Sequence, residues 1–119
     1  MLKNIAMIAL AISPTPSIAY TLEDGNSLND ICKVTGGSAD STISAAFCAG
    51  YIRAAFEQLW VNEVAKGNHP EKCVPSSLEN AQIIELVKAY LRNNPTRRDT
   101  LGVVVVHMAL HQAFPDCFS

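Results

Sequence analysis

The 119-residue chain has no excess of positive charge and no long hydrophobic stretch beyond its first residues. Nine Lys and Arg stand against eleven Asp and Glu, which gives a formal net charge of −2 at pH 7. Nucleic-acid-binding domains usually carry a basic patch or stripe, so this balance argues against a nucleic-acid partner. After the N-terminal run, no apolar stretch approaches the roughly 20 residues that span a membrane. We therefore expect a soluble mature protein.

The sequence also lacks the motifs of common active and cofactor sites. It has no Gly-rich phosphate loop, no G-x-S-x-G motif and no paired carboxylates, and no two cysteines have the close spacing of a zinc knuckle. His107 and His111 share a helix face at a spacing that can bind zinc, but HMALH has no Glu after its first His and no obvious third ligand. We interpret both histidines as lying at a helix rim or in an interface. The sequence therefore predicts a protein that is not an enzyme and that holds no metal or cofactor.

The first 19 residues have the pattern of a cleavable secretory signal peptide. Lys3 precedes an apolar run at 5–12, and small residues stand just before the expected cleavage site. Eight apolar residues are too few to cross a bilayer. We therefore predict export to the periplasm, with 20–119 as a single mature domain.

Four cysteines follow the expected cleavage site, at Cys32, Cys48, Cys73 and Cys117. An even number of cysteines in a short exported chain predicts two disulfides rather than a catalytic thiol. Sequence alone allows three pairings. Cys73 and Cys117 bracket two helical patterns joined by a turn, so their positions at the outer ends of a hairpin favour pairing them and leave Cys32 for Cys48. The main alternative pairs Cys48 with Cys73 and Cys32 with Cys117.

Apolar residues recur at helical spacing and predict an all-α, disulfide-stapled bundle of four to five helices. Residues 20–29 are polar, and we expect them to be loose, with the first short helix beginning near Ser27. A second helix is expected at 42–64, capped by one of the polar residues at 40–42. Arg53 and Glu57, four residues apart, are expected to form a solvated pair on its outer face.

The third and fourth helices are predicted on either side of an Asn-Asn-Pro-Thr turn. Ser76 and Glu79 have capping-box spacing for the start of the third helix, which should end near Asn93 because Pro95 disfavours a helical residue before it. Asn94 is the expected cap of the fourth helix, with Pro95 at its first position.

Four consecutive valines at 103–106 have the propensity of a strand. The apolar pattern continues to Ala113, however, and gives a run near twenty residues, which is helix length. A helix that is apolar all round is usually central or buried in a dimer. Phe56 and Trp60 are also expected to pack in the core rather than to form an exposed patch.

Three blocks of the chain resemble the Tai/Rap immunity protein family. Residues 48–52 (CAGYI) resemble its helix-opening C-x-G-Y-I motif. The second block runs from CVP at 73–75 through Asn94-Pro95 to Arg98. The closing A-L-x-x-A-F-P-C motif is matched at 109–117, with one residue, Asp116, inserted before the cysteine. The resemblance covers about residues 28–117.

This resemblance implies a small, all-helical, disulfide-containing periplasmic protein that is often a homodimer. Members of the family neutralise peptidoglycan amidases delivered by type VI secretion by binding the toxin and blocking its substrate groove. The matched residues look like scaffold, so the resemblance assigns no inhibitory residue.

Two loops are the candidate partner-binding segments, one between the second and third helices and one at the Asn-Pro turn. The candidate contact residues are Asn62, Glu63, Lys66, Asn68, His69, Asn93, Asn94, Arg97, Arg98 and Asp99. An alternative function is that of a general, acid-activated periplasmic chaperone. Such a protein would dissociate and expose apolar surface at low pH.

Overall fold

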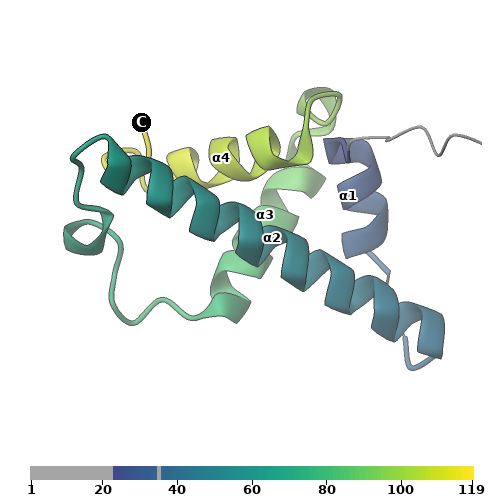
Figure 1. Cartoon of the computed structure of the whole chain (residues 1–119). Helices are drawn as coiled ribbons and strands as arrows, with labels where there is room; N and C mark the ends of the chain where they lie inside the picture. The colour runs from purple at the N-terminus through teal and green to yellow at the C-terminus, as the bar shows by residue number, and fades with distance from the viewer. Residues whose placement is uncertain (1–22, 35) are drawn as a thin grey trace, which may run out of the picture.

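The computed structural model describes residues 23–34 and 36–119, and the predicted signal peptide lies outside them. The described residues form four α-helices and two short 3-10 turns (Figure 1). In chain order these are α1 Gly25–Cys32, α2 Ala39–Ala65, η1 Pro70–Lys72, α3 Asn80–Asn93, η2 Pro95–Arg97 and α4 Gly102–Ala113. No strand longer than an isolated bridge occurs within these ranges, which confirms the predicted all-α bundle.

The long helix α2 contacts all three other helices (Figure 1). It begins three residues earlier than predicted, because the hydroxyl of Ser38 accepts a hydrogen bond from the Ser41 backbone N–H at 3.1 Å. Asp40, a predicted cap, lies instead in the first turn, where its negative charge is attracted to the positive end of the helix dipole. On the outer face, the predicted pair of Arg53 and Glu57 is confirmed at 3.2 Å.

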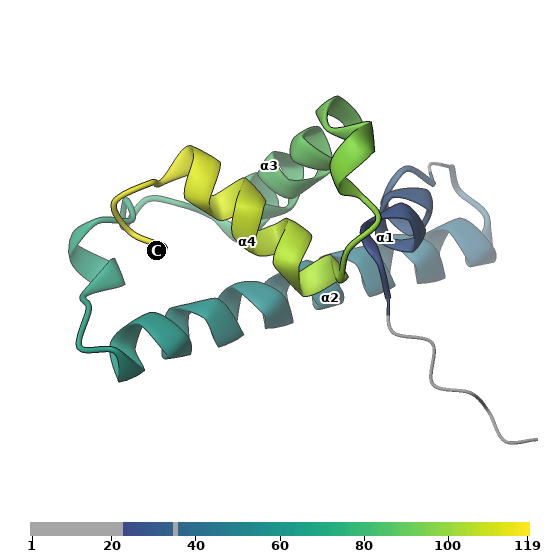
Figure 2. The same cartoon turned by 90° about the horizontal axis from the view of Figure 1, so that it is seen from above.

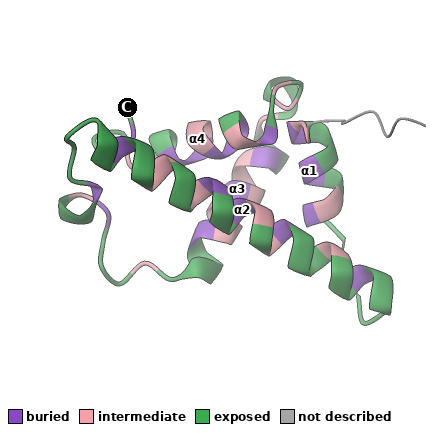
Figure 3. Ribbon diagram, in the orientation of Figure 1, coloured by how far each residue is buried: buried purple, intermediate pink, exposed green. Residues whose placement is uncertain are grey.

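The core lies where α2 crosses α3 and α4, and Figure 3 shows buried segments of these helices where they meet. The largest fully buried side chains include Leu28, Ile52, Leu91, Leu110 and Phe118. The Phe56 ring packs against Phe118, with centroids 6.1 Å apart, and against Trp60 at 5.7 Å. Phe56 and Trp60 therefore pack against the core, although both remain partly exposed.

The expectation that residues 20–29 are loose is wrong for the helical part of this segment. The carboxylate of Asp24 accepts a hydrogen bond from the Ser27 backbone N–H at 2.8 Å and starts α1 at Gly25. The Gly25 N–H in turn donates to the Thr100 carbonyl at 2.9 Å. A Cβ on Gly25 would lie 2.7 Å from the Arg98 carbonyl oxygen, so this close approach requires glycine. These contacts with the chain before α4 fix the start of α1.

The start of α3 also differs from the prediction. The helix begins at Asn80, and its capping box joins Glu79 to Gln82 instead of Ser76 to Glu79. The Glu79 N–H donates to the Gln82 side-chain oxygen at 2.7 Å. The preceding turn, closed by the Leu78 N–H on the Pro75 carbonyl at 3.1 Å, delays the helix by one turn.

The fourth helix was predicted to begin at Pro95, and this is wrong: η2 and a bend precede α4, which begins at Gly102. The Arg98 guanidinium donates to the carbonyls of Leu91 and Arg92 and folds the chain back over the end of α3. The Gly102 N–H donates to the Glu23 carbonyl at 2.8 Å. These non-local bonds hold the segment away from helical geometry.

The valine run is helical, as predicted. Val105 and Val106 are fully buried, whereas Val104 is 40% exposed on the opposite face. The apolar face of α4 is therefore buried mostly within its own chain rather than in a dimer interface.

Both predicted disulfides are present, which excludes the alternative pairing. Cys32–Cys48 joins the end of α1 to α2, with Cα atoms 5.1 Å apart. Cys73–Cys117 joins the loop after η1 to the C-terminal tail at 5.5 Å. The inserted Asp116 does not prevent this second bridge.

Candidate partner-binding surface

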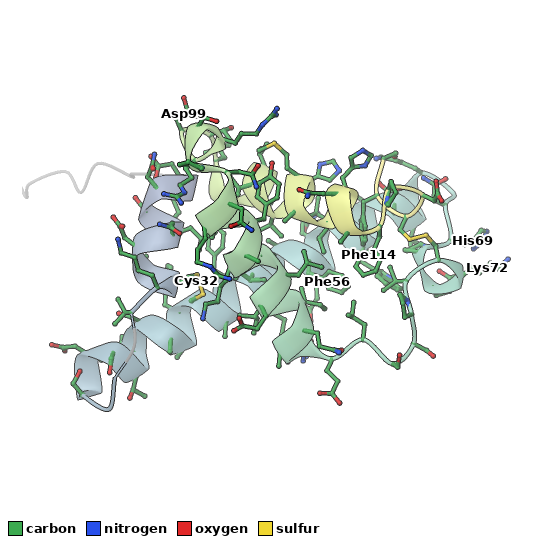
Figure 4. All side chains as sticks on the ribbon, turned by 180° about the vertical axis from the view of Figure 1, so that it is seen from behind. Cys32, Phe56, His69, Lys72, Asp99 and Phe114 are labelled. Carbon is green, nitrogen blue, oxygen red and sulfur yellow. A yellow bond between two sulfur atoms is a disulfide. The ribbon has the colours of Figure 1, made fainter. Side chains whose placement is uncertain are left out.

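The two predicted partner-binding loops lie at opposite ends of the molecule. Figure 4 shows Asp99 at one end and His69 with Lys72 at the other, and Figure 2 shows the same separation from above. Helix α4 runs between them, and its 12 residues span about 18 Å. The structure therefore does not bring the two loops together into one site.

Glu63 is the main departure from the predicted contact surface, because it is only 3% exposed. Its carboxylate accepts hydrogen bonds from the Asn68 amide at 2.7 Å and from the Lys66 ammonium at 3.0 Å, and the Ser119 hydroxyl lies at 3.4 Å. The bonds from Asn68 and Lys66 lower the pKa of Glu63 below its usual 4.5. Glu63 therefore ties the end of α2 to the C-terminus and is not available on the surface.

The other candidates in this first loop are exposed: Asn62, Lys66, Asn68 and His69. The His69 ring nitrogen Nδ1 lies 3.0 Å from the Glu71 carboxylate. A hollow of about 270 Å³ opens beside Asn68, His69 and Asp116. This end of the molecule offers a polar surface braced by the Cys73–Cys117 bridge.

The second loop is divided between structural and accessible residues. Asn94 and Arg98 are half-buried, and both donate side-chain hydrogen bonds to carbonyls of α3: Asn94 to Tyr90 at 2.9 Å and Arg98 to Leu91. Asn93, Arg97 and Asp99 are exposed. A hollow of about 410 Å³ lies beside Arg97 and Asp99 and is bordered by Met108 of α4. Arg97 and Asp99 are therefore the accessible charges of this loop.

Sequence reasoning missed an apolar outer surface on α2. Ile43 is 67% exposed, Phe47 46%, Val61 58% and Val64 52%. Ile43, Phe47 and Val61 recur near one face at helical spacing, and this periodicity was detectable in the sequence.

The histidines and carboxylates do not gather into a metal site in the described part of the chain. No three His, Cys, Asp or Glu residues there are placed to hold an ion. His111 makes a hydrogen bond to the Phe118 carbonyl through its ring. Within the same residues, no helix is both long and apolar enough to cross a membrane.

The family model for Rap1a immunity proteins matches residues 24–117. The chain belongs to the Rap1a immunity protein family. The matched segment extends from the Asp24 cap of α1 to Cys117 and so contains all four helices and both disulfides. This confirms the resemblance drawn from the sequence motifs.

No curated protein and no solved structure gives a significant match to the chain. Membership of the Rap1a family indicates an immunity protein that binds a cognate secreted effector, and proteins of this kind are generally not enzymes. Two disulfides in so small a domain agree with an oxidising compartment.

Proposed function

We propose that this protein is a periplasmic immunity protein that binds and inhibits a peptidoglycan amidase delivered by type VI secretion. It would thereby protect the producing cell from its own or a sibling's toxin. The observation that carries the proposal is the Rap1a family match over the whole helical domain. The predicted signal peptide and the two disulfides support a periplasmic location.

The fold suits a stoichiometric inhibitor because its exposed loops are held in place before binding. The Cys73–Cys117 bridge and the buried Glu63 fix the loop after α2. The Arg98 guanidinium fixes the loop after α3. Loops that are already ordered lose little conformational entropy on association, which favours affinity. The proposed contacts are the exposed Asn62, Lys66, Asn68 and His69 at one end, and Asn93, Arg97 and Asp99 at the other.

We also infer a homodimer, formed through the N-terminal half of α2. Ile43 and Phe47 are exposed on this half, and the Phe47 ring stacks on Tyr51 with centroids 6.2 Å apart. The valine-rich α4 is the weaker candidate, since Val105 and Val106 are already buried within the chain.

The proposal predicts that a secreted peptidoglycan amidase is encoded beside this gene, and it is tested with that amidase. We expect the purified mature protein to form a stable complex with the amidase and to stop its cleavage of peptidoglycan. In cells that export the amidase, the full-length protein should restore growth. A variant that lacks residues 1–19 should bind in vitro but fail to protect. If the mature protein neither binds the amidase nor blocks its activity, the proposal that it inhibits an amidase is wrong.

A further inference from the structure

A hydrophobic groove lies between the C-terminal half of α2 and the segment that leads into α3. We call it the aromatic groove, because Phe56 and Trp60 of α2 line both of its adjoining hollows. One hollow, of about 280 Å³, extends from these rings to Val74, Leu78 and Ile83. The other, of about 440 Å³, extends along α2 to Val61. Figure 4 shows Phe56 close to the middle of the molecule, away from Asp99 at one end and His69 at the other.

The groove is built from ordered parts of the fold. Val74 and Ile83 at its base are 8% and 5% exposed, whereas Phe56, Trp60 and Leu78 are half-buried. Val74 follows Cys73, so the bridge to Cys117 anchors this wall of the groove. A preformed apolar concavity of this size accommodates a large apolar side chain.

The charged residues that line the groove are both carboxylates. Glu57 lines one hollow and Glu71 the other, and neither hollow is lined by a Lys or Arg. A hydrogen bond from its own backbone N–H, assisted by His69 and Lys72, lowers the pKa of Glu71. Arg53 contacts Glu57 through one carboxylate oxygen only, at 3.2 Å. The groove therefore combines an apolar base with carboxylates at its rim.

We propose that the aromatic groove binds a segment of the effector in which a large apolar side chain stands next to a Lys or Arg. The apolar side chain would fill the space between Trp60 and Leu78, and the cation would lie against Glu57 or Glu71. A large side chain that is fully desolvated in a pocket often dominates the binding energy, and a complementary charge beside it adds specificity. This inference rests on the proposed function, because it takes the cognate effector as the occupant.

Two matched variants test the groove. Val61→Lys places a cation in its lining, whereas Val64→Lys makes the same change at a similarly exposed valine of the same helix that lines neither hollow. Because both positions are more than half exposed, both variants should fold. With the neighbouring amidase, Val61→Lys should weaken binding about tenfold or more, and Val64→Lys less than about twofold.

A second measurement does not depend on the amidase. Trp60 is the only tryptophan in the chain, so its fluorescence reports on the groove. N-acetylated, C-amidated Leu-Arg-Leu should produce a saturable change in emission, and Leu-Glu-Leu should bind about tenfold more weakly or not at all. Val61→Lys should abolish the response to Leu-Arg-Leu, and Val64→Lys should keep it.

The outcomes separate the groove from the proposed function. If the amidase forms no complex with the unmodified protein, the proposed function fails, whatever the peptides do. If the amidase binds both variants equally, or if the two peptides bind alike, the groove inference fails while the proposed function stands. If Val61→Lys instead dissociates a homodimer in sedimentation experiments, the groove is a contact between copies and the inference is also overturned.

Discussion

The buried carboxylate of Glu63 joins three parts of the chain that are far apart in sequence. It lies near the end of α2, accepts hydrogen bonds from Asn68 and Lys66 in the following loop, and is within 3.4 Å of the Ser119 hydroxyl. A buried polar group costs stability unless such partners are present. This residue therefore contributes to the order of the loop rather than to direct contact with a partner.

Replacing Glu63 with Gln should lower the free energy of unfolding by about 1–3 kcal/mol, because one donor loses its charged acceptor in a buried site. Chemical denaturation monitored by circular dichroism measures this change. Glu57→Gln is the control, since its pair with Arg53 is exposed, and it should change stability by less than about 1 kcal/mol. Equal effects of the two substitutions would contradict the role assigned to Glu63.

The lowered pKa of Glu63 predicts that the free energy of unfolding decreases at acid pH. Its pKa in the folded protein is below the usual 4.5, so the folded state binds its proton less readily than the unfolded state. The stabilisation is complete above pH 4.5 and is lost as the pH falls through the folded-state pKa. Denaturation midpoints between pH 7 and pH 2 should therefore converge for the native protein and Glu63→Gln at the acid end. If the two midpoints differ by a constant amount across this range, the Glu63 carboxylate is not the origin of the difference in stability.

At the scale of the helices, α2 and α4 meet closely at Gly102. A Cβ at this position would lie 2.6 Å from the Tyr51 hydroxyl oxygen and 3.0 Å from the ring carbon that carries it. By contrast, a Cβ added at Gly50, one residue before Tyr51, would meet nothing within 4 Å. We therefore expect a Gly→Ala substitution to have opposite effects on stability at the two positions.

Gly102→Ala should destabilise the protein by about 1–3 kcal/mol, because the added methyl group displaces Tyr51 and loosens the contact between α2 and α4. Gly50→Ala should stabilise it by about 0.5–1 kcal/mol, because alanine favours the helix interior. Thermal unfolding of the two variants measures the difference. A loss of stability in Gly50→Ala comparable to that in Gly102→Ala would show that steric contact with Tyr51 is not the cause.

The two disulfides close chain segments of different length, with sequence separations of 16 and 44 residues. In the chain-entropy model, removing Cys32–Cys48 by double Cys→Ser substitution costs about 3 kcal/mol, and removing Cys73–Cys117 costs about 4 kcal/mol. Urea denaturation of each double variant tests this order. A larger loss for the shorter ring would indicate that local packing, rather than chain entropy, dominates.

At the scale of the whole molecule, the proposed homodimer depends on the exposed apolar residues of α2. Phe47→Glu should convert the dimer to a monomer, because it would bury an unpaired charge in the interface. Val104→Glu is the matched control on α4, since Val104 and Phe47 are similarly exposed at 40% and 46%, and it should leave the dimer intact. Sedimentation velocity at several concentrations measures both. A monomeric native protein at all concentrations would rule out the interface.

Local signals in the sequence predicted the features that depend on neighbouring residues or on a single hairpin. The helical class, the helical valine run, both disulfides and the Arg53–Glu57 pair follow from periodicity and spacing. The start of α4 did not follow, because Pro95 is a good helix start locally. The hydrogen bonds that join residues 23–26 to residues 98–102, together with those from the Arg98 side chain to α3, hold the segment before α4 out of helical geometry.

The candidate site was less predictable than the fold because it also depends on contacts between segments that are far apart in the sequence. Glu63 looks like an exposed loop residue until Ser119, 56 residues away, is placed beside it. The aromatic groove likewise requires α2 to lie against residues 74–83, a packing that periodicity within one helix does not reveal.

The order of the disulfides along the chain has a consequence for maturation. Cysteines pair consecutively, first Cys32 with Cys48 and then Cys73 with Cys117. Under the proposed export from the N-terminus, the first pair reaches the oxidising side of the membrane before the second. An oxidant that joins cysteines in their order of arrival thus produces the native pairing directly, and the protein should mature without a disulfide isomerase.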